Sequence, residues 1–201
     1  MSHKSPAAAL ALALAITLSL LSGCALLPSG SGAAPPPRQA RADIQVFTLD
    51  GRIAVQQATQ RHSSNLSWRH AAARDEMLFA TPLGQGLAEL TRDSGGARLL
   101  LADRREFVAA DWEGLAAQVF GFSLPLSALS RWLVGAVPAT ARDVALDALG
   151  RPQHLLSDGW RIDYLDYESA HANALPTLIE LRRAEDDIEV RLKIDEWQVV
   201  R

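Results

Sequence analysis

The chain has 201 residues, of which 48% are hydrophobic, with 20 basic and 23 acidic residues and a formal net charge of −3 at pH 7. This slightly acidic balance argues against a nucleic acid partner, which would call for a basic surface. The single cysteine excludes an internal disulfide and a thiolate metal cluster.

The N-terminus has the features of a lipoprotein signal. A short basic start precedes an apolar run over residues 7–21, which is short for a membrane-spanning helix of about 20 apolar residues. Leu21-Ser22-Gly23-Cys24 then resembles the bacterial lipobox, in which the cysteine is lipidated and the signal is cleaved before it. The small residues at this boundary favour cleavage over a retained membrane anchor. We therefore predict a signal peptide over residues 1–23, and S-diacylglyceryl and N-acyl groups on Cys24.

Residues 24–42 are predicted to be a lipidated tether. Residues 28–37 read PSGSGAAPPP, so the first half is flexible and the proline triplet is extended. Such a composition buries too little apolar surface to fold. Lipoproteins that stay in the inner membrane usually carry aspartate after the cysteine, whereas Ala25 follows it here. We therefore expect one domain, residues 43–201, held at the periplasmic face of the outer membrane.

Most of this domain is predicted to form strands. Alternating apolar and polar residues, separated by short turns, are typical of half-buried strands in consecutive hairpins. Short connections require antiparallel pairing. The expected turns include Ser94-Gly95-Gly96 and the acidic segment 184–187. The predicted strands cover residues 43–56, 64–70, 76–81, 87–92, 97–103, 106–109, 160–166, 177–183, 188–194 and 197–200.

Two helices interrupt the strands. Asp111 is a suitable N-cap for a helix over residues 112–120, which Gly121 would end. Pro125 suits the first turn of a second helix that ends at Gly135. Apolar residues recur at helical spacing in both segments, and packing against the sheet would explain both stripes.

The residues give no sign of catalysis. The histidines after residue 23 show no metal-ligand spacing on one helix, and the GxSxG, GxxxxGK[ST] and HExxH motifs are missing. The adjacent acids Asp186 and Asp187 fall in a predicted turn, where they would be solvated. We predict no enzyme activity, no metal and no cofactor apart from the lipid on Cys24, so any transport would run downhill by binding affinity.

Four segments carry a resemblance to a known family. They are Gly51-Arg52-Ile53, Thr81-Pro82-Leu83-Gly84, residues 125–135 (PLSALSRWLVG) and residues 193–200 (KIDEWQVV). Over nearly the whole domain the chain resembles the LolB family, the outer-membrane lipoprotein receptors of Gram-negative bacteria. The family often has a longer helix before the first strand, whereas the prolines at 35–37 allow only a short turn over residues 38–42.

The resemblance implies both a fold and a function. The fold would be mainly β with a few helices (α+β), namely an unclosed, strongly curved antiparallel β-barrel whose helices cover an apolar cavity. The function would be to accept lipoproteins from the periplasmic chaperone LolA and insert them into the outer membrane without ATP. We expect a monomer whose partners are LolA, the acyl chains of the cargo and the membrane that holds its anchor.

Acyl chains need a dry apolar cavity, because exposing them to water costs about 0.8 kcal/mol per methylene. Alternation does not tell which face of the sheet lies inside. The alternative is a lipidated scaffold with a filled core, which binds a protein partner and no acyl chain. The candidate cavity residues are Leu66, Trp68, Met77, Phe79, Leu99, Leu101, Trp132 and Leu133.

Leu83 is predicted to lie at a loop tip. Pro82 and Gly84 occupy the second and fourth positions of a type I turn. Leu83 either folds back over the core, stays exposed as single leucines often do, or dips into lipid. The family's corresponding loop favours lipid contact. Burying one leucine is worth about 1.5–3 kcal/mol, enough for a brief and reversible contact.

Overall fold

The computed structural model describes residues 39–120 and 125–200. The described residues belong to one compact unit, residues 35–201. The predicted signal peptide, the lipidation site Cys24 and the helix stop at Gly121 lie outside the described residues.

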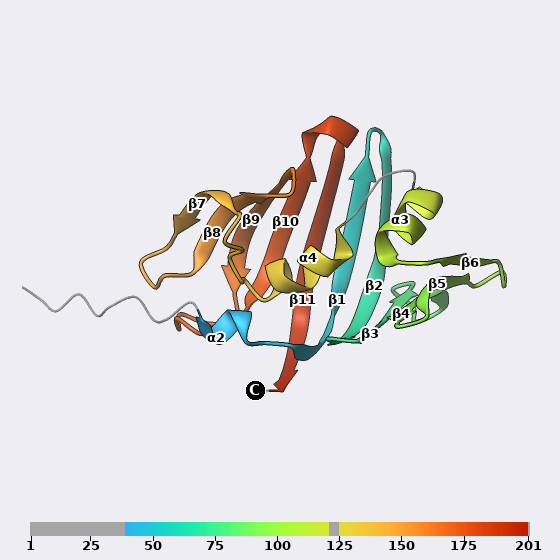
Figure 1. Ribbon diagram of the computed structural model, residues 1–201, viewed down its shortest axis with the longest axis horizontal. Coiled ribbons are helices and arrows are strands. Elements are labelled where there is room, and N and C mark those ends of the chain that lie inside the picture. The colour runs from blue at the N-terminus through green and yellow to red at the C-terminus, as the bar shows by residue number, and fades with distance from the viewer. Residues whose placement is uncertain (1–38, 121–124, 201) are drawn as a thin grey trace, which may run out of the picture. The chain divides into compact units, whose positions relative to one another are not determined.

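One antiparallel sheet of eleven strands dominates the unit, in the order β6-β5-β4-β3-β2-β1-β11-β10-β9-β8-β7. Within the described part, β6 and β7 stand at the two ends of this order and do not pair with each other. The sheet is therefore unclosed, and it curves so strongly that β3–β6 turn away from the plane of β1 and β11 (Figure 1). The predicted unclosed antiparallel barrel is confirmed. The strands are β1 (Val46–Gln57), β2 (Gln60–Ala71), β3 (Arg74–Ala80), β4 (Gly86–Asp93), β5 (Gly96–Leu101), β6 (Glu106–Ala109), β7 (Arg142–Leu146), β8 (Pro152–Ser157), β9 (Trp160–Tyr167), β10 (Pro176–Arg183) and β11 (Ile188–Val200).

Two helices, α3 (Trp112–Phe120) and α4 (Leu126–Leu133), cover one face of the sheet. Helix α4 lies over β10, β11 and β1 in the view of Figure 1, and α3 packs beside β5 and β6. A short helix, α2 (Gln39–Ala42), precedes β1, and a 3-10 turn, η1 (Ala184–Asp186), joins β10 to β11. The expected short turn before the first strand is thus a single helical turn.

The helix ends follow their sequence signals. Asp111 caps α3, because its Oδ1 accepts a hydrogen bond from the Gly114 N–H at 2.7 Å. Pro125 immediately precedes α4 as its N-cap residue. Helix α4 ends in a Schellman motif, in which the N–H of Gly135 donates to the Trp132 carbonyl at 2.9 Å and that of Ala136 to Arg131 at 3.0 Å. Gly135 has φ +73°, which a residue with a Cβ rarely adopts.

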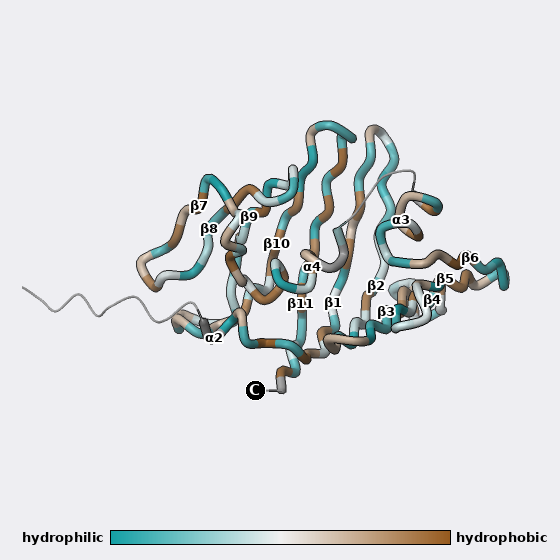
Figure 2. The backbone as a smooth tube through the Cα atoms, viewed as in Figure 1, coloured by the Kyte–Doolittle hydropathy of each residue, from teal (hydrophilic) through white to brown (hydrophobic). Residues whose placement is uncertain are grey.

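The core lies between the helix-covered face and the helices. Apolar side chains alternate with polar ones along the strands, as the alternating colours of β10, β11 and β1 show (Figure 2). Phe47 packs edge-on against Trp68 and Trp197, with ring centroids 5.5 and 5.3 Å apart. Burial of this apolar face is the main stabilising term of the fold.

Two parts of the predicted strand pattern were wrong. The segments 188–194 and 197–200 belong to the single strand β11. Glu196 pairs with Asp50 and Ile194 with Gly51, so Asp195 forms a β-bulge. The bulge lets the strand continue through the polar residues between the two segments. Strands β7 and β8 were not predicted. Strand β7 has a left-handed residue, Asp143 at φ +48°, and β8 begins with proline, so neither shows a regular alternation.

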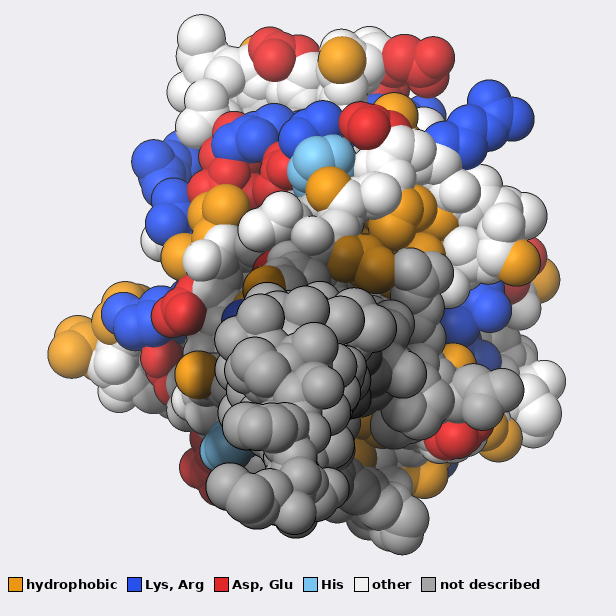
Figure 3. Space-filling view, turned by 90° about the vertical axis from the view of Figure 1, so that its left-hand side faces the viewer, with side chains coloured by type: hydrophobic (Ala, Val, Ile, Leu, Met, Phe, Trp, Pro, Cys, Tyr) orange, Lys and Arg blue, Asp and Glu red, His pale blue; other side chains and the backbone are white. Residues whose placement is uncertain are grey.

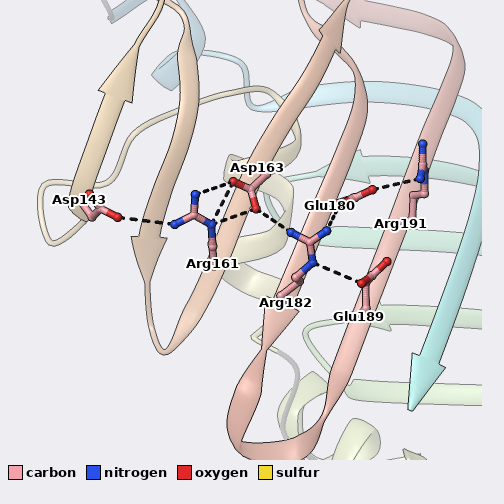
Figure 4. A network of polar contacts seen from close by, with 7 residues as sticks. All are labelled: Asp143, Arg161, Asp163, Glu180, Arg182, Glu189 and Arg191. Carbon is pink, nitrogen blue, oxygen red and sulfur yellow. Dashed lines mark hydrogen bonds and ion pairs between the residues drawn. The ribbon is translucent and has the colours of Figure 1, made fainter. Parts of the chain in front are cut away.

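The outer face of β7–β11 is polar. Acidic and basic side chains of neighbouring strands alternate there, and the space-filling view onto the β7 side shows them intermingled in one band (Figure 3). Typical contacts are Arg161 to Asp163 at 3.0 Å and Arg182 to Asp163 and Glu189, each at 3.2 Å. We call this set the outer charge ladder; it consists of Asp143, Arg161, Asp163, Glu180, Arg182, Glu189 and Arg191 (Figure 4).

Candidate functional site

The strand register brings the six candidate residues of the strands onto one face. Leu66 pairs with Phe79, and Trp68 with Met77, across β2 and β3. Strand β4 continues this face through Leu90 and Ala88, which pair with Leu99 and Leu101 of β5. The face is the one that packs into the core. It is therefore the inner face, a point that alternation alone had left open.

The two candidate residues of α4 complete this interior from the opposite side. Trp132 and Leu133 are both 0% exposed. The Tyr164 hydroxyl of β9 donates a hydrogen bond to the Trp132 carbonyl at 2.9 Å, so one specific polar contact holds the helix to the sheet. Burial raises the pKa of this hydroxyl, which keeps it protonated as a donor. The eight candidates thus gather in one helix-covered apolar interior, and their contact with acyl chains stays a prediction.

Two buried polar atoms in the interior lack partners. The indole N–H groups of Trp132 and Trp160 have no hydrogen-bond acceptor within the described part of the chain. A buried donor without an acceptor costs about 1–3 kcal/mol, so an acceptor brought by a ligand would be favoured there. These donors were not singled out from the sequence, because spacing does not show which indole nitrogens find a partner.

A buried polar cluster, also not predicted, joins β2, β3 and β4. Asp75 is 2% exposed. Its carboxylate accepts hydrogen bonds from Trp68 Nε1 at 2.9 Å and Arg92 Nε at 2.7 Å, and its Oδ1 lies 2.6 Å from His70 Nδ1. Burial alone would raise the pKa of Asp75, but these hydrogen bonds lower it below its ordinary value. The available signal was an acid and a histidine flanking the predicted turn between 70 and 76.

The β3–β4 loop carries Leu83. The Gly84 N–H donates to the Thr81 carbonyl at 2.9 Å, which closes the expected turn, and the Gln85 N–H donates to Thr81 Oγ1 at 3.1 Å. Asn65 of β2 holds the loop from the side through the same carbonyl at 3.2 Å. Leu83 is 98% exposed, so it does not fold back over the core. Its contact with lipid stays a prediction.

Arg41 of α2 fixes the start of the domain. Its Nη2 donates to the carbonyls of Ala172 and Ala174, each at 2.8 Å, and its guanidinium lies 5.4 Å from the ring centroid of Tyr167. Burial lowers the pKa of this guanidinium. The chain therefore enters the folded unit at a defined place beside the β9–β10 loop.

Residues 39–120 and 125–200 contain no cluster of three histidine, cysteine, aspartate or glutamate side chains suited to a metal ion. Among these same residues, no helix has the length and apolar character needed to span a membrane.

The fold and the site define an open-barrel protein with a helix-covered apolar interior and a leucine-tipped loop. A solved structure with this fold is the putative outer membrane lipoprotein-sorting protein domain from Vibrio parahaemolyticus, with a TM-score of 0.52 and 10% identity, covering 81% of this chain and 88% of that one.

Sequence comparisons give the family. The family model described as "Outer membrane lipoprotein LolB" matches residues 45–197. The chain is 38% identical to the outer-membrane lipoprotein LolB of Azoarcus sp. (strain BH72), over 90% of this chain and 91% of that protein. It is 36% identical to that of Dechloromonas aromatica (strain RCB), over 91% and 94%. The chain belongs to the LolB family of outer-membrane lipoproteins, as its motifs had indicated.

Proposed function

We propose that this protein is the outer-membrane-anchored receptor that accepts lipoproteins from the chaperone LolA and inserts them into the outer membrane. The observation that carries the proposal is the apolar inner face of a curved, unclosed sheet, covered by α3 and α4. Membership of the LolB family supports it.

Acyl chains enter the interior between α4 and the sheet. In the described conformation the protein's own side chains bury one another there, with Trp132 and Leu133 fully inside. Each methylene of the cargo that leaves water contributes about 0.8 kcal/mol, which drives displacement of the helix from the inner face. The hydrogen bond from Tyr164 to the Trp132 carbonyl is one contact that this movement breaks.

The unpartnered indoles suit the polar part of the cargo. A lipidated cysteine carries ester and amide carbonyls next to its acyl chains, and these are hydrogen-bond acceptors. The N–H groups of Trp132 and Trp160, which have no acceptor within residues 39–120 and 125–200, are donors at the interior. One such pairing would orient the cargo with its chains along the apolar face.

Delivery uses two contacts with the membrane. The lipid on Cys24 holds the protein permanently, because several acyl chains bind a bilayer durably while one does so only marginally. Leu83, exposed at its loop tip, dips into the bilayer while cargo leaves. The protein acts as a monomer without ATP and without catalysis, so transfer from LolA follows from tighter binding here, with about 1.4 kcal/mol for each tenfold difference.

Photocrosslinking tests cargo binding. A photoreactive residue at Trp132 or Phe79 should crosslink to the acyl chains of a lipoprotein, and a fluorescent fatty acid should compete. The matched control is Leu165 of β9, a half-exposed leucine outside the core. If the folded protein crosslinks at none of the interior positions, the acyl cavity fails and the lipidated scaffold becomes the better account.

The anchor has its own test. Mass spectrometry of the mature protein should find acylated Cys24 at the N-terminus, and Cys24→Ala should leave the protein soluble or uncleaved. A mature protein with an unmodified thiol and another N-terminus would contradict the anchor while leaving cargo binding open.

A further inference from the structure

The β3–β4 loop lies beside the β5–β6 turn, which carries arginines that have no role in the cargo binding proposed above. Strands β3–β6 are consecutive hairpins, so the loop after β3 and the turn after β5 lie at the same end of the sheet (Figure 1). The Ala102 N–H donates to the Leu87 carbonyl at 2.9 Å, which places the β5–β6 turn against the first residues of β4. We call residues 81–87 and 102–105 the loop edge.

The two halves of the loop edge differ in chemistry. Residues 81–87 carry no charge, and their leucines, Leu83 and Leu87, are 98% and 39% exposed. Residues 102–105 bring two exposed arginines. Arg105 pairs with its neighbour Asp103 at 2.7 Å, whereas the Arg104 guanidinium makes no ion pair or hydrogen bond within the described part of the chain.

The backbone holds Arg104 outward at the turn. Its N–H donates to the Leu101 carbonyl at 2.9 Å, and the Leu101 N–H donates to the Arg105 carbonyl at 2.9 Å. Arg104 has φ +69°, a left-handed conformation that glycine or asparagine adopts more readily. The turn therefore presents an exposed cation, unpaired among the described residues, beside the leucines of the loop edge.

We propose that the loop edge binds anionic phospholipid, with Leu83 and Leu87 among the acyl chains and the unpaired Arg104 on a headgroup phosphate. The inference rests on the proposed function, because it assigns a lipid class to the delivery contact. Apolar side chains beside arginines match the boundary between acyl chains and phosphate, where arginine keeps its charge in the headgroup layer.

Charge complementarity makes the contact depend on lipid composition and salt. Each basic residue near an anionic membrane strengthens binding by about fivefold. The attraction is screened beyond a Debye length of about 8 Å at physiological ionic strength, so added salt weakens it. Contact through Leu83 alone would depend on neither.

The experiment uses the full lipidated protein in vesicles of zwitterionic lipid, with or without phosphatidylglycerol. Acylation blocks the Cys24 thiol, so a polarity-sensitive dye is attached to Gln85→Cys on the exposed loop. The test variant is Arg104→Asn, since asparagine suits φ +69° and keeps the turn folded, and Arg105 stays paired with Asp103. The matched control is Arg61→Gln, an exposed arginine of β2 without an ion pair among the described residues.

We expect phosphatidylglycerol to shift the dye toward an apolar environment, and salt to reverse the shift. Arg104→Asn should lose this lipid-dependent increment by about fivefold, while Arg61→Gln keeps it. Equal signals in the two vesicle types, or equal loss in the control, would overturn the inference. Slower uptake of cargo from LolA without vesicles would show that Arg104 docks a protein, which also overturns it. Crosslinking at Trp132 reports separately on the proposed function.

Discussion

Two leucines mark the two working regions of this molecule. Leu133 of α4 is 0% exposed and packs into the interior, whereas Leu83 of the β3–β4 loop is 98% exposed at a turn. The side chain is the same, so its surroundings alone decide what it does. Burial of Leu133 stabilises the fold, whereas the exposed apolar side chain of Leu83 is available for contact with a lipid bilayer.

The largest expected effect is on stability and tests this contrast directly. Leu133→Ala should lower the free energy of unfolding by about 2–5 kcal/mol, because it removes buried methyl groups and leaves a cavity. Leu83→Ala should change it by less than about 0.5 kcal/mol. Urea denaturation of both variants gives the two values. Similar losses would show that the loop leucine is part of the core after all.

The second prediction concerns delivery of cargo, for which Leu83 should matter although it contributes little to stability. Leu83→Glu should leave folding and cargo binding intact but slow insertion of cargo into liposomes by about ten- to a hundredfold. That range corresponds to the loss of about 1.5–3 kcal/mol of leucine burial in the membrane. Normal insertion by a stable variant would remove the proposed role of the loop.

A third prediction separates the regions by pH. Asp75→Asn should destabilise the fold by about 1.5–3 kcal/mol, because the Asp75 carboxylate accepts charged hydrogen bonds. Since its pKa is lowered in the folded state, the carboxylate stabilises the fold above its unfolded pKa of about 3.9, and this contribution is lost as pH falls through the folded value.

Urea midpoints of wild type and Asp75→Asn should therefore differ at about pH 6 and converge toward about pH 3. The β3–β4 loop carries no titratable group over residues 81–87, so the effect of an uncharged substitution such as Leu83→Gln on insertion should not follow this pH dependence. A constant difference in urea midpoint across the range would contradict the role assigned to the charge.

The smallest effect concerns the outer charge ladder. Arg182→Met should lower the free energy of unfolding by no more than about 1 kcal/mol, because Arg182 is half-exposed and its less exposed partners Asp163 and Glu180 keep their ion pairs with Arg161 and Arg191. Denaturation with and without added salt measures it. A loss as large as that of Leu133→Ala would mean that the outer face, and not the interior, holds this half of the sheet together.

Much of the fold follows from local patterns. Strand β6 and helix α3 fall on the predicted residues, because a clear alternation defines the strand and Asp111 caps the helix. The patterns did not give β7, where Asp143 at φ +48° interrupts the alternation. Nor did they join the two parts of β11, because the bulge at Asp195 depends on a partner strand far away in the sequence.

The site divides in the same way. Leu66 and Trp68 are two positions apart in a predicted strand, which places them on the same face, and the register confirms this. Alternation along a strand identifies two faces but does not tell which one is buried, so the position of the helices was needed to show which face lies inside. The cluster around Asp75 depends on the meeting of three strands, and no spacing within one strand reveals that.

The absence of pairing between the edge strands β6 and β7 affects how the width of the sheet is determined. The diameter of a closed barrel is fixed by the number and stagger of its strands, because every strand is hydrogen-bonded on both sides. Here the ladder runs unbroken from β6 to β7 and stops. The width of the curved sheet is therefore not fixed by hydrogen bonds between β6 and β7. Under the proposed function, an unclosed sheet would let one protein bind cargoes whose hydrocarbon differs in length and number of chains.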